Sequence, residues 1–261
     1  MKCGTIIDKL EISYPPMYAM EWDNIGLLVG DRDAEVRTVL VALDVSDAAV
    51  EDAILGHADM IVTHHPLIFK PISRIVRQDP VGRRILTLAE NRISYYAMHT
   101  NFDVSEMADL NADELNLMNP EILEETYRDE TGIREGLGRV GNLEKKMTLR
   151  EFAESVKKIY QLPSVRVYGN PQREIGRAAV CSGSGKSVIG SALRSGADVF
   201  VTGDLDYHTS IDAVAAGLSL VDAGHYGTEA GFIPYMTEAL KRMFPKLEVI
   251  PEKIEQPYEV V

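Results

Sequence analysis

The sequence contains little cysteine, one tryptophan and no long apolar segment. Its two cysteines, Cys3 and Cys181, are too few for a disulfide framework, and because no Cys-x-x-Cys pair is present we expect ordinary reduced thiols. No apolar run approaches the roughly 18 residues that a membrane-spanning helix needs, and the N-terminus lacks the profile of a signal peptide. These absences predict a cytoplasmic protein without a membrane partner. The tryptophan, Trp22, is expected to pack in a core or at its rim.

Positive charge is also scarce. The 261 residues include 27 Lys and Arg against 40 Asp and Glu, which gives a net charge of −13. Such a field repels phosphate backbones, so nucleic-acid binding would require a local basic patch. The densest basic stretch, 134–158, is interrupted by acidic residues throughout. We therefore expect no nucleic-acid partner, and the excess of acid is compatible with a demand for cations.

Strand and helix patterns alternate along the chain. Seven near-continuous apolar segments are typical of strands in sheets that are covered on both faces. Helical patterns lie between them, and one opens with a capping box formed by Thr148 and Glu151. This alternation predicts an α/β fold with mixed sheets flanked by helices. The predicted strands are 36–45, 58–65, 93–100, 164–169, 176–181, 197–204 and 218–225, and the predicted helices are 46–55, 80–91, 149–160 and 228–242.

A repeated segment indicates two related halves. Gly56–Thr63 is similar to Ser195–Thr202, and both segments follow a helical pattern and end in polar residues. The acidic segment 107–130 shows no strong strand character and is expected to connect the halves. We expect two similar α/β domains from an internal duplication, 1–125 plus 226–261 and 126–225, although a chance likeness of two α/β segments is the alternative.

Five residues at predicted strand ends have the chemistry of metal ligands: His64, His65, Asp103, His225 and Glu229. Ligands of open α/β sheets gather beyond the carboxyl ends of the strands. Successive side chains of a strand point to opposite faces, so His64 and His65 serve one cluster only if the strand has ended, or else they bind separate ions. Imidazole and carboxylate together suit Zn, Fe, Mn or Ni.

Each of these residues also has an ordinary structural explanation. Asp103 is suited to cap the segment that follows it, and Glu229 to be a first-turn acid of a helix whose N-cap is Thr228. A histidine at a strand end is more often structural than a ligand. The occurrence of all of them in similar repeat units favours the metal site.

Four motifs carry a resemblance to a known family. The segments DNIGLLVG (23–30), THHPLIF (63–69), MHTNFD (98–103) and GHYGTE (224–229) resemble those of the NIF-three-like family, whose members are commonly called GTP cyclohydrolase type 2 homologues. The resemblance extends over essentially the whole chain. It implies a dinuclear metal site in the cleft between two α/β domains, and a ring-shaped homohexamer. It also implies that His64 binds one ion and His65 the other, that Asp103 and His225 are ligands, and that Glu229 bridges.

Paired ions of this kind predict a hydrolase that acts through a metal-bound hydroxide. We expect a small nucleotide-like or heterocyclic substrate, with His99 or His208 as the catalytic proton carrier. The alternative is a metal-binding regulatory or protein-interaction ring without turnover. The loop 181–187 resembles a phosphate-binding loop but has Val180 where that motif needs glycine. The roles of Lys186 and Asp204 stay open.

Overall fold

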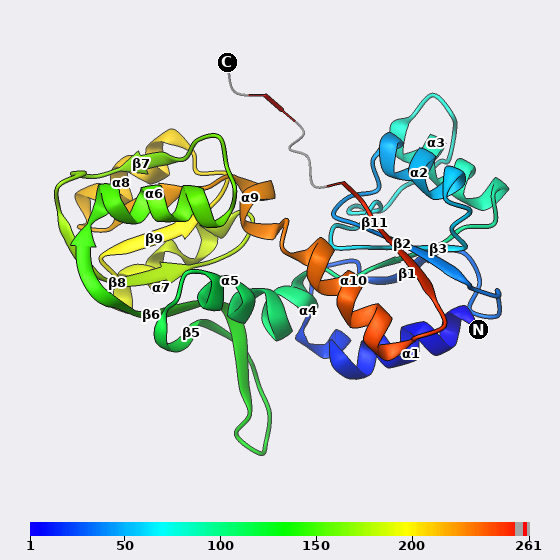
Figure 1. Cartoon of the computed structure of the whole chain (residues 1–261), viewed down its shortest axis with the longest axis horizontal. Coiled ribbons are helices and arrows are strands. Elements are labelled where there is room, and N and C mark those ends of the chain that lie inside the picture. The colour runs from blue at the N-terminus through cyan, green and yellow to red at the C-terminus, as the bar shows by residue number, and fades with distance from the viewer. Residues whose placement is uncertain (254–257, 260–261) are drawn as a thin grey trace. The chain divides into compact units, whose positions relative to one another are not determined.

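A computed structural model describes residues 1–253, 258 and 259, which fall into two compact units (Figure 1). The first unit contains Met1–Phe102 and the segment that begins at Gly231, and the second contains Asp103–Ala230. The domain boundaries given above stay a prediction, and in the structure residues 103–125 pack with the second unit. Residues 254–257 and 260–261 of the predicted first domain lie outside the described part of the chain.

The first unit is built on a five-stranded mixed sheet in the order β1-β4-β3-β2-β11. Its strands run parallel except β1, which pairs antiparallel with β4. Helices α2 and α3 cover one face, and α1 and α10 cover the other (Figure 1). The strands are β1 (Gly26–Val29), β2 (Thr38–Ala42), β3 (Met60–Thr63), β4 (Ser94–Ala97) and β11 (Glu248–Pro251). The helices are α1 (Cys3–Ser13), η1 (Pro16–Tyr18), α2 (Asp47–Leu55), α3 (Pro80–Glu90), α4 (Thr100–Phe102) and α10 (Phe232–Met243).

The second unit is built on a six-stranded mixed sheet in the order β5-β6-β8-β9-β10-β7. Alternate side chains of its central strand serve two cores, because Val199 and Val201 pack with α5 and α6 while Phe200 packs with α7 and α8. The strands are β5 (Met118–Arg128), β6 (Arg134–Thr148), β7 (Arg166–Tyr168), β8 (Glu174–Val180), β9 (Val199–Thr202) and β10 (Ser219–Asp222). The helices are η2 (Asp103–Met107), α5 (Ala108–Glu114), α6 (Leu149–Ile159), η3 (Gly185–Val188), α7 (Ile189–Arg194), α8 (Tyr207–Ala215) and α9 (His225–Glu229).

The α/β fold class with two mixed, helix-flanked sheets is confirmed. Six of the seven predicted strands contain an observed one, and the seventh, 176–181, overlaps β8, which begins at Glu174. The expectation that 107–130 lacks strand character is wrong, while its role as the connector between the halves stays a prediction. Within it lies β5, which forms an antiparallel hairpin with β6. Most residues of β5 are exposed or half-buried, so the strand lacks the apolar run that marks a strand buried on both faces.

The two sheets share two local features. In each unit an aspartate just before the central parallel strand accepts two successive backbone N–H groups of the neighbouring segment, Asp59 at 2.7 and 3.1 Å and Asp198 at 2.8 and 3.0 Å. In each unit a glycine with φ 117°, Gly30 or Gly169, lies against a serine of an adjacent strand, and a Cβ atom would lie 2.6 Å from the serine hydroxyl oxygen at Gly30 and 3.0 Å from it at Gly169. The duplication and the cleft expected from the sequence stay predictions.

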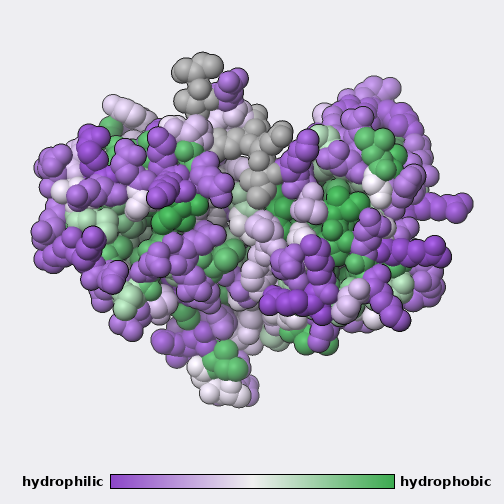
Figure 2. Space-filling view, viewed as in Figure 1, coloured by the Kyte–Doolittle hydropathy of each residue, from purple (hydrophilic) through white to green (hydrophobic). Residues whose placement is uncertain are grey.

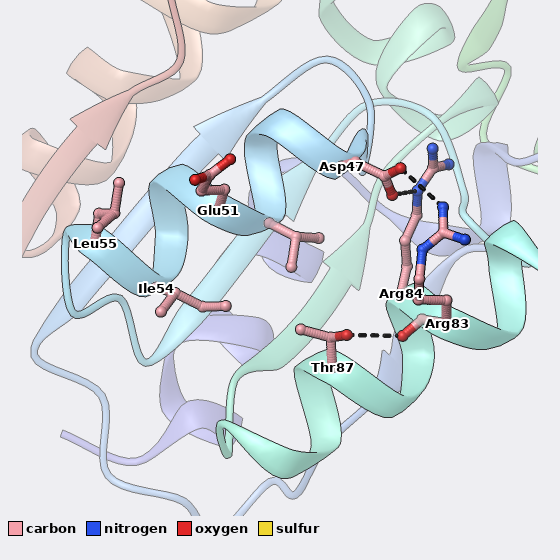
Figure 3. A pocket seen from close by; sticks show the side chains of 8 residues that line it. Asp47, Glu51, Ile54, Leu55, Arg83, Arg84 and Thr87 are labelled. Atoms are coloured by element: carbon pink, nitrogen blue, oxygen red, sulfur yellow. Dashed lines mark hydrogen bonds and ion pairs between the residues drawn. The ribbon is translucent and has the colours of Figure 1, made fainter. Parts of the chain in front are cut away.

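The face of the molecule in Figure 2 is mostly hydrophilic, with smaller apolar patches. Within the described residues, no helix is long and apolar enough to cross a membrane. A groove of about 470 Å³ lies between α2 and α3. Asp47 accepts hydrogen bonds there from Arg83 and Arg84, at 2.9 and 2.7 Å, and Figure 3 shows these side chains. None of the residues that line this groove belongs to the predicted metal site.

Candidate metal centre

Three imidazoles gather at one end of the first sheet. His64 and His65 directly follow β3, and His99 follows β4, which is parallel to β3. The ring centroids of His64 and His65 are 5.0 Å apart, and the centroid of the His99 ring lies 5.3 Å from that of His64 and 5.7 Å from that of His65. Each histidine offers a ring nitrogen within 4.8 Å of the nitrogens of the other two. Because β3 ends at Thr63, the side chains of His64 and His65 can lie on the same side. Together with His99 they form a cluster that could hold a metal ion.

The Nδ1 atom of each of these histidines lies against an oxygen acceptor. His64 Nδ1 donates to the carbonyl oxygen of Met98 at 3.1 Å. His65 Nδ1 lies 3.0 Å from Asp44 Oδ1, and His99 Nδ1 lies 2.9 Å from Asp23 Oδ1. Since carbonyl and ionised carboxylate oxygens only accept hydrogen bonds, the Nδ1 atoms carry the protons and Nε2 is the nitrogen suited to bind a metal.

His64 is fully buried, and its ring packs against Phe102 and Phe232 at centroid distances of 6.1 and 5.4 Å. This apolar packing fixes the imidazole in one orientation. The side chain of His65 is 20% exposed and is held instead by Asp44. Within this cluster His64 is therefore enclosed by apolar side chains, while His65 is partly accessible to solvent.

Asp23 is the buried carboxylate behind His99, and its side chain has no exposed surface. It accepts hydrogen bonds from the backbone N–H of Thr100 at 3.0 Å and from the Thr100 hydroxyl. Burial opposes its ionisation, but the hydrogen bonds from His99 and Thr100 outweigh that cost and lower the pKa of Asp23 to about 2. Asp23 is therefore an anion at neutral pH, and it orients the His99 ring.

The second unit holds His225 and Glu229 on one short helix. α9 begins at His225 after Gly224, whose φ of 75° suits glycine, and it ends at Glu229. Four residues apart on a helix, the two side chains meet, with His225 Nε2 3.1 Å from Glu229 Oε2. The prediction of one helix over 228–242 with Thr228 as its N-cap is wrong, because the chain forms α9 and then α10.

His225 repeats the arrangement of the first unit. Its Nδ1 atom lies 2.7 Å from Asp204 Oδ2, which again makes Nε2 the nitrogen suited to bind a metal. Asp204 thus has a definite position, next to His225. His208, the other residue that the sequence suggested for this region, lies exposed on α8 with its ring against Tyr207.

Asp103 and Glu229 are buried carboxylates of the second unit, 8% and 3% exposed. Asp103 accepts a hydrogen bond from the Ser182 hydroxyl at 2.8 Å. The next residue, Gly183, has a φ of 57°, and a Cβ atom there would lie 2.3 Å from Glu229 Oε1. Burial and the negative charges of both carboxylates raise the pKa of the Cys181 thiol. The loop therefore needs its glycine to make room for a carboxylate.

The phosphate-loop likeness of 181–187 has a different structural basis. After β8 the segment turns into the short helix η3. Lys186 forms an ion pair with Asp206, which caps α8 by accepting the backbone N–H of Thr209 at 2.9 Å. Lys186 thus ties the loop to the start of α8.

Asp23 and Asp44 were missed as site residues by sequence reasoning. Asp44 follows β2 by two residues just as His65 follows β3, and the register pairs Ala42 with Thr63. The same search for polar residues at strand ends would have found it. Asp23 is the first residue of the DNIGLLVG motif, which gave no indication of its partner.

The sequence model of one family, described as Duf34/NIF3 (NGG1p interacting factor 3), matches residues 1–257. A Streptococcus pneumoniae protein named GTP cyclohydrolase 1 type 2 homolog is 37% identical over 230 residues, covering 87% of this chain and 85% of that protein. A Clostridium acetobutylicum protein of the same name is 32% identical over 250 residues, with coverage of 95% and 93%.

Solved structures agree with this match. A Bacillus cereus protein related to NIF3 superimposes with a TM-score of 0.92 at 28% identity, covering 100% of this chain and 99% of that one. Reduced HcgD from Methanocaldococcus jannaschii gives a TM-score of 0.83 at 35% identity, with coverage of 96% and 97%. The family resemblance stated from the sequence motifs is confirmed.

Proposed function

This chain belongs to the Duf34/NIF3 family, and on that premise we propose that it is a metal-dependent hydrolase of a small heterocyclic or nucleotide-like substrate. Its proposed ligands for two divalent ions are His64, His65, Asp103, His225 and Glu229. The observation that carries the proposal is that each of the three histidines in this set, His64, His65 and His225, has its Nδ1 atom against an oxygen acceptor, which leaves Nε2 available to bind a metal. Such outer hydrogen bonds are typical of metal-binding histidines.

The carboxylates support the same proposal. An ionised carboxylate buried as deeply as Asp103 or Glu229 carries a desolvation cost that a bound cation offsets. Imidazole nitrogens with carboxylate oxygens suit Zn, Fe, Mn or Ni. Glu229 has two oxygens and is proposed to bridge the ions. The donor set of this chain therefore fits divalent metal.

Divalent ions bound by these residues would supply Lewis acidity, which makes water a nucleophile near neutral pH. The residues of this chain have two tasks, to hold the ions and to transfer a proton. His99 fits the second task, because Asp23 fixes its ring with the proton on Nδ1 and leaves Nε2 to accept another. It fits better than His208, which lies exposed beside Tyr207 on α8.

The substrate class comes from the names of the relatives, which are called GTP cyclohydrolase 1 type 2 homolog. A hydrolytic opening of a purine ring needs an activated water and a proton carrier, and the proposed site offers both. Purine nucleotides are therefore the first compounds to test.

Metal content tests the ligand set. We expect up to two ions per chain in wild-type protein loaded with Zn and dialysed, and clear loss in His65→Ala and in Glu229→Gln, measured by elemental analysis. His57→Asn is the matched control, because His57 is an exposed histidine of the first unit with a φ of 51°, which asparagine tolerates. Stoichiometric metal in a variant that lacks both His64 and His225 would contradict the assignment.

Turnover separates the hydrolase from a metal-binding protein without catalysis. Wild type loaded with Mn, Zn or Fe is incubated with GTP and other purine nucleotides, and products are detected by mass spectrometry. We expect consumption that His99→Gln abolishes while its metal content stays at the wild-type level. Full metal content with no nucleotide consumed would overturn the hydrolase proposal and favour the regulatory or protein-interaction role.

A further inference from the structure

Two large aromatic side chains of the first unit are exposed beside the imidazole group. Trp22 is 58% exposed and Phe69 is 48% exposed. Their ring centroids are 5.8 Å apart with an interplanar angle of 57°. Both rings also contact His99, at centroid distances of 6.0 and 6.1 Å. Exposure of so much aromatic surface carries a hydration cost, and surfaces of this kind commonly bind ligands.

The loops that carry these rings are held in place by hydrogen bonds. The residue after Trp22 is Asp23, whose buried carboxylate binds both His99 and Thr100. Asn24 Nδ2 then donates to the carbonyl oxygen of Ile68, the residue before Phe69, at 2.5 Å. The same chain segment therefore positions Trp22, Phe69 and the proposed proton carrier relative to one another, and the aromatic rings need little ordering when a ligand binds.

We infer that Trp22 and Phe69 form a stacking platform for the planar ring of the substrate. The inference rests on the proposed function and names the part of the substrate that these residues recognise. A planar heterocycle on Trp22 lies within reach of His99, where a ring atom undergoing hydrolysis needs a proton carrier. The face of every nucleobase stacks on aromatic side chains, so such a platform selects planar rings without requiring a particular base.

The chemistry of the platform separates this ligand class from others. Trp22 and Phe69 offer π surface and apolar edges, which suit a planar ring and not a sugar or a phosphate. The ring of the ligand is thus the part that these side chains contact.

The sequence supplies a probe for the test, because Trp22 is its one tryptophan. Full-length protein labelled with 5-fluorotryptophan gives one fluorine resonance, which reports on Trp22 alone. The Zn-loaded protein is titrated with guanosine and with adenosine, and with ribose as the compound that lacks a base. We expect a saturable shift of the resonance with both nucleosides and no shift with ribose.

Variants assign the effect to the platform. Phe69→Ala is expected to weaken nucleoside binding by about fivefold or more, the order expected from loss of one stacking partner. Tyr207→Ala is the matched control, because Tyr207 is a 71% exposed aromatic residue on α8 of the second unit, and it should leave the titration unchanged. Equal shifts with ribose and nucleosides, or no shift at all, would overturn the platform.

The outcomes keep this inference apart from the proposed function. Full metal content without a nucleoside-dependent shift overturns the platform while the metal site stands. A saturable, Phe69-dependent shift in protein that binds no metal supports the platform and overturns the hydrolase. A Trp22 resonance that depends on protein concentration and not on nucleoside would show that a second copy of the chain covers these rings, which also overturns the platform.

Discussion

Replacement of Gly183 by alanine is the sharpest test of how the second unit holds its carboxylates. The new Cβ atom would lie 2.3 Å from Glu229 Oε1 and 3.2 Å from His225 Nε2. Cβ atoms essentially never approach closer than 3.0 Å, so the Glu229 carboxylate or the loop must move by about 0.7 Å, the difference between 3.0 and 2.3 Å. Metal-ligand distances tolerate only about 0.2 Å. Metal binding should therefore suffer before the fold does.

Two quantities follow for Gly183→Ala. The φ of 57° is left-handed, and a residue with a Cβ atom there loses roughly 1–2 kcal/mol of unfolding free energy. Displacement of Glu229 should add a loss of metal affinity on the order of tenfold or more, as seen when a ligand is poorly held. Urea denaturation of metal-free protein measures the first quantity, and competition for Zn with a chelator measures the second.

Gly196→Ala separates backbone strain from displacement of the carboxylate. Gly196 lies in the same unit and has a φ of 74°, but a Cβ atom there would meet nothing within 4 Å. We expect it to lose similar stability and to keep wild-type metal affinity. Equal metal affinity in the two variants would refute the claim that the Gly183 loop positions Glu229 for a metal ion.

Three further predictions test single interactions. Asp204→Asn should weaken metal binding about 10- to 100-fold with unchanged circular dichroism, because Asp204 holds Nδ1 of His225; unchanged affinity would separate the pair from the metal site. Cys3 and Cys181 are 0% and 6% exposed, and burial raises the pKa of both thiols. Mass spectrometry should show that they resist iodoacetamide at pH 8 in native protein and react in urea. Rapid alkylation of the native protein would contradict this burial. Burial raises the pKa of Glu114. Its ionisation therefore costs stability as the pH rises from the unfolded pKa of about 4.3 through the folded pKa. Glu114→Gln should be more stable than wild type at pH 7, and a difference in unfolding free energy that does not shrink towards pH 4 would oppose this assignment.

The sequence predicted those parts of the fold that are buried on both faces. β2, β3, β9 and β10 are fully buried and appear as continuous apolar runs. β5 is largely exposed, and its place in the sheet depends on pairing with β6 and not on its own pattern. Local hydrogen bonds were predictable where a motif encodes them, as in the capping box of Thr148 and Glu151.

The site was predictable as a set of ligand types and not as a set of partners. His64 and His65 stand out in the sequence because they follow a strand. Asp44 follows β2 in the same way and could be recognised as a polar strand-end residue, and Met98 directly follows β4, but nothing in the sequence pairs either of them with a particular histidine. Only the strand register brings them together. For α9, the decisive residue is Gly224, whose left-handed φ starts the helix at His225 instead of at Thr228.

The two units carry different residues at the ends of corresponding parallel strands. Thr63 pairs with Ala97 in the first sheet and Thr202 pairs with Asp222 in the second, so His64 and Gly203 occupy corresponding strand ends.

A side chain at 203 has no room, because a Cβ atom there would lie 2.4 Å from the backbone nitrogen of His225. The second unit therefore carries its imidazole at the start of α9, and Asp204, in the position that corresponds to His65, holds it. What the units share is a carboxylate that fixes Nδ1 of an imidazole, Asp44 in one and Asp204 in the other. Because the two units share this geometry at positions with different residues, comparing the two half-sequences aligns the strands and misplaces the predicted ligands.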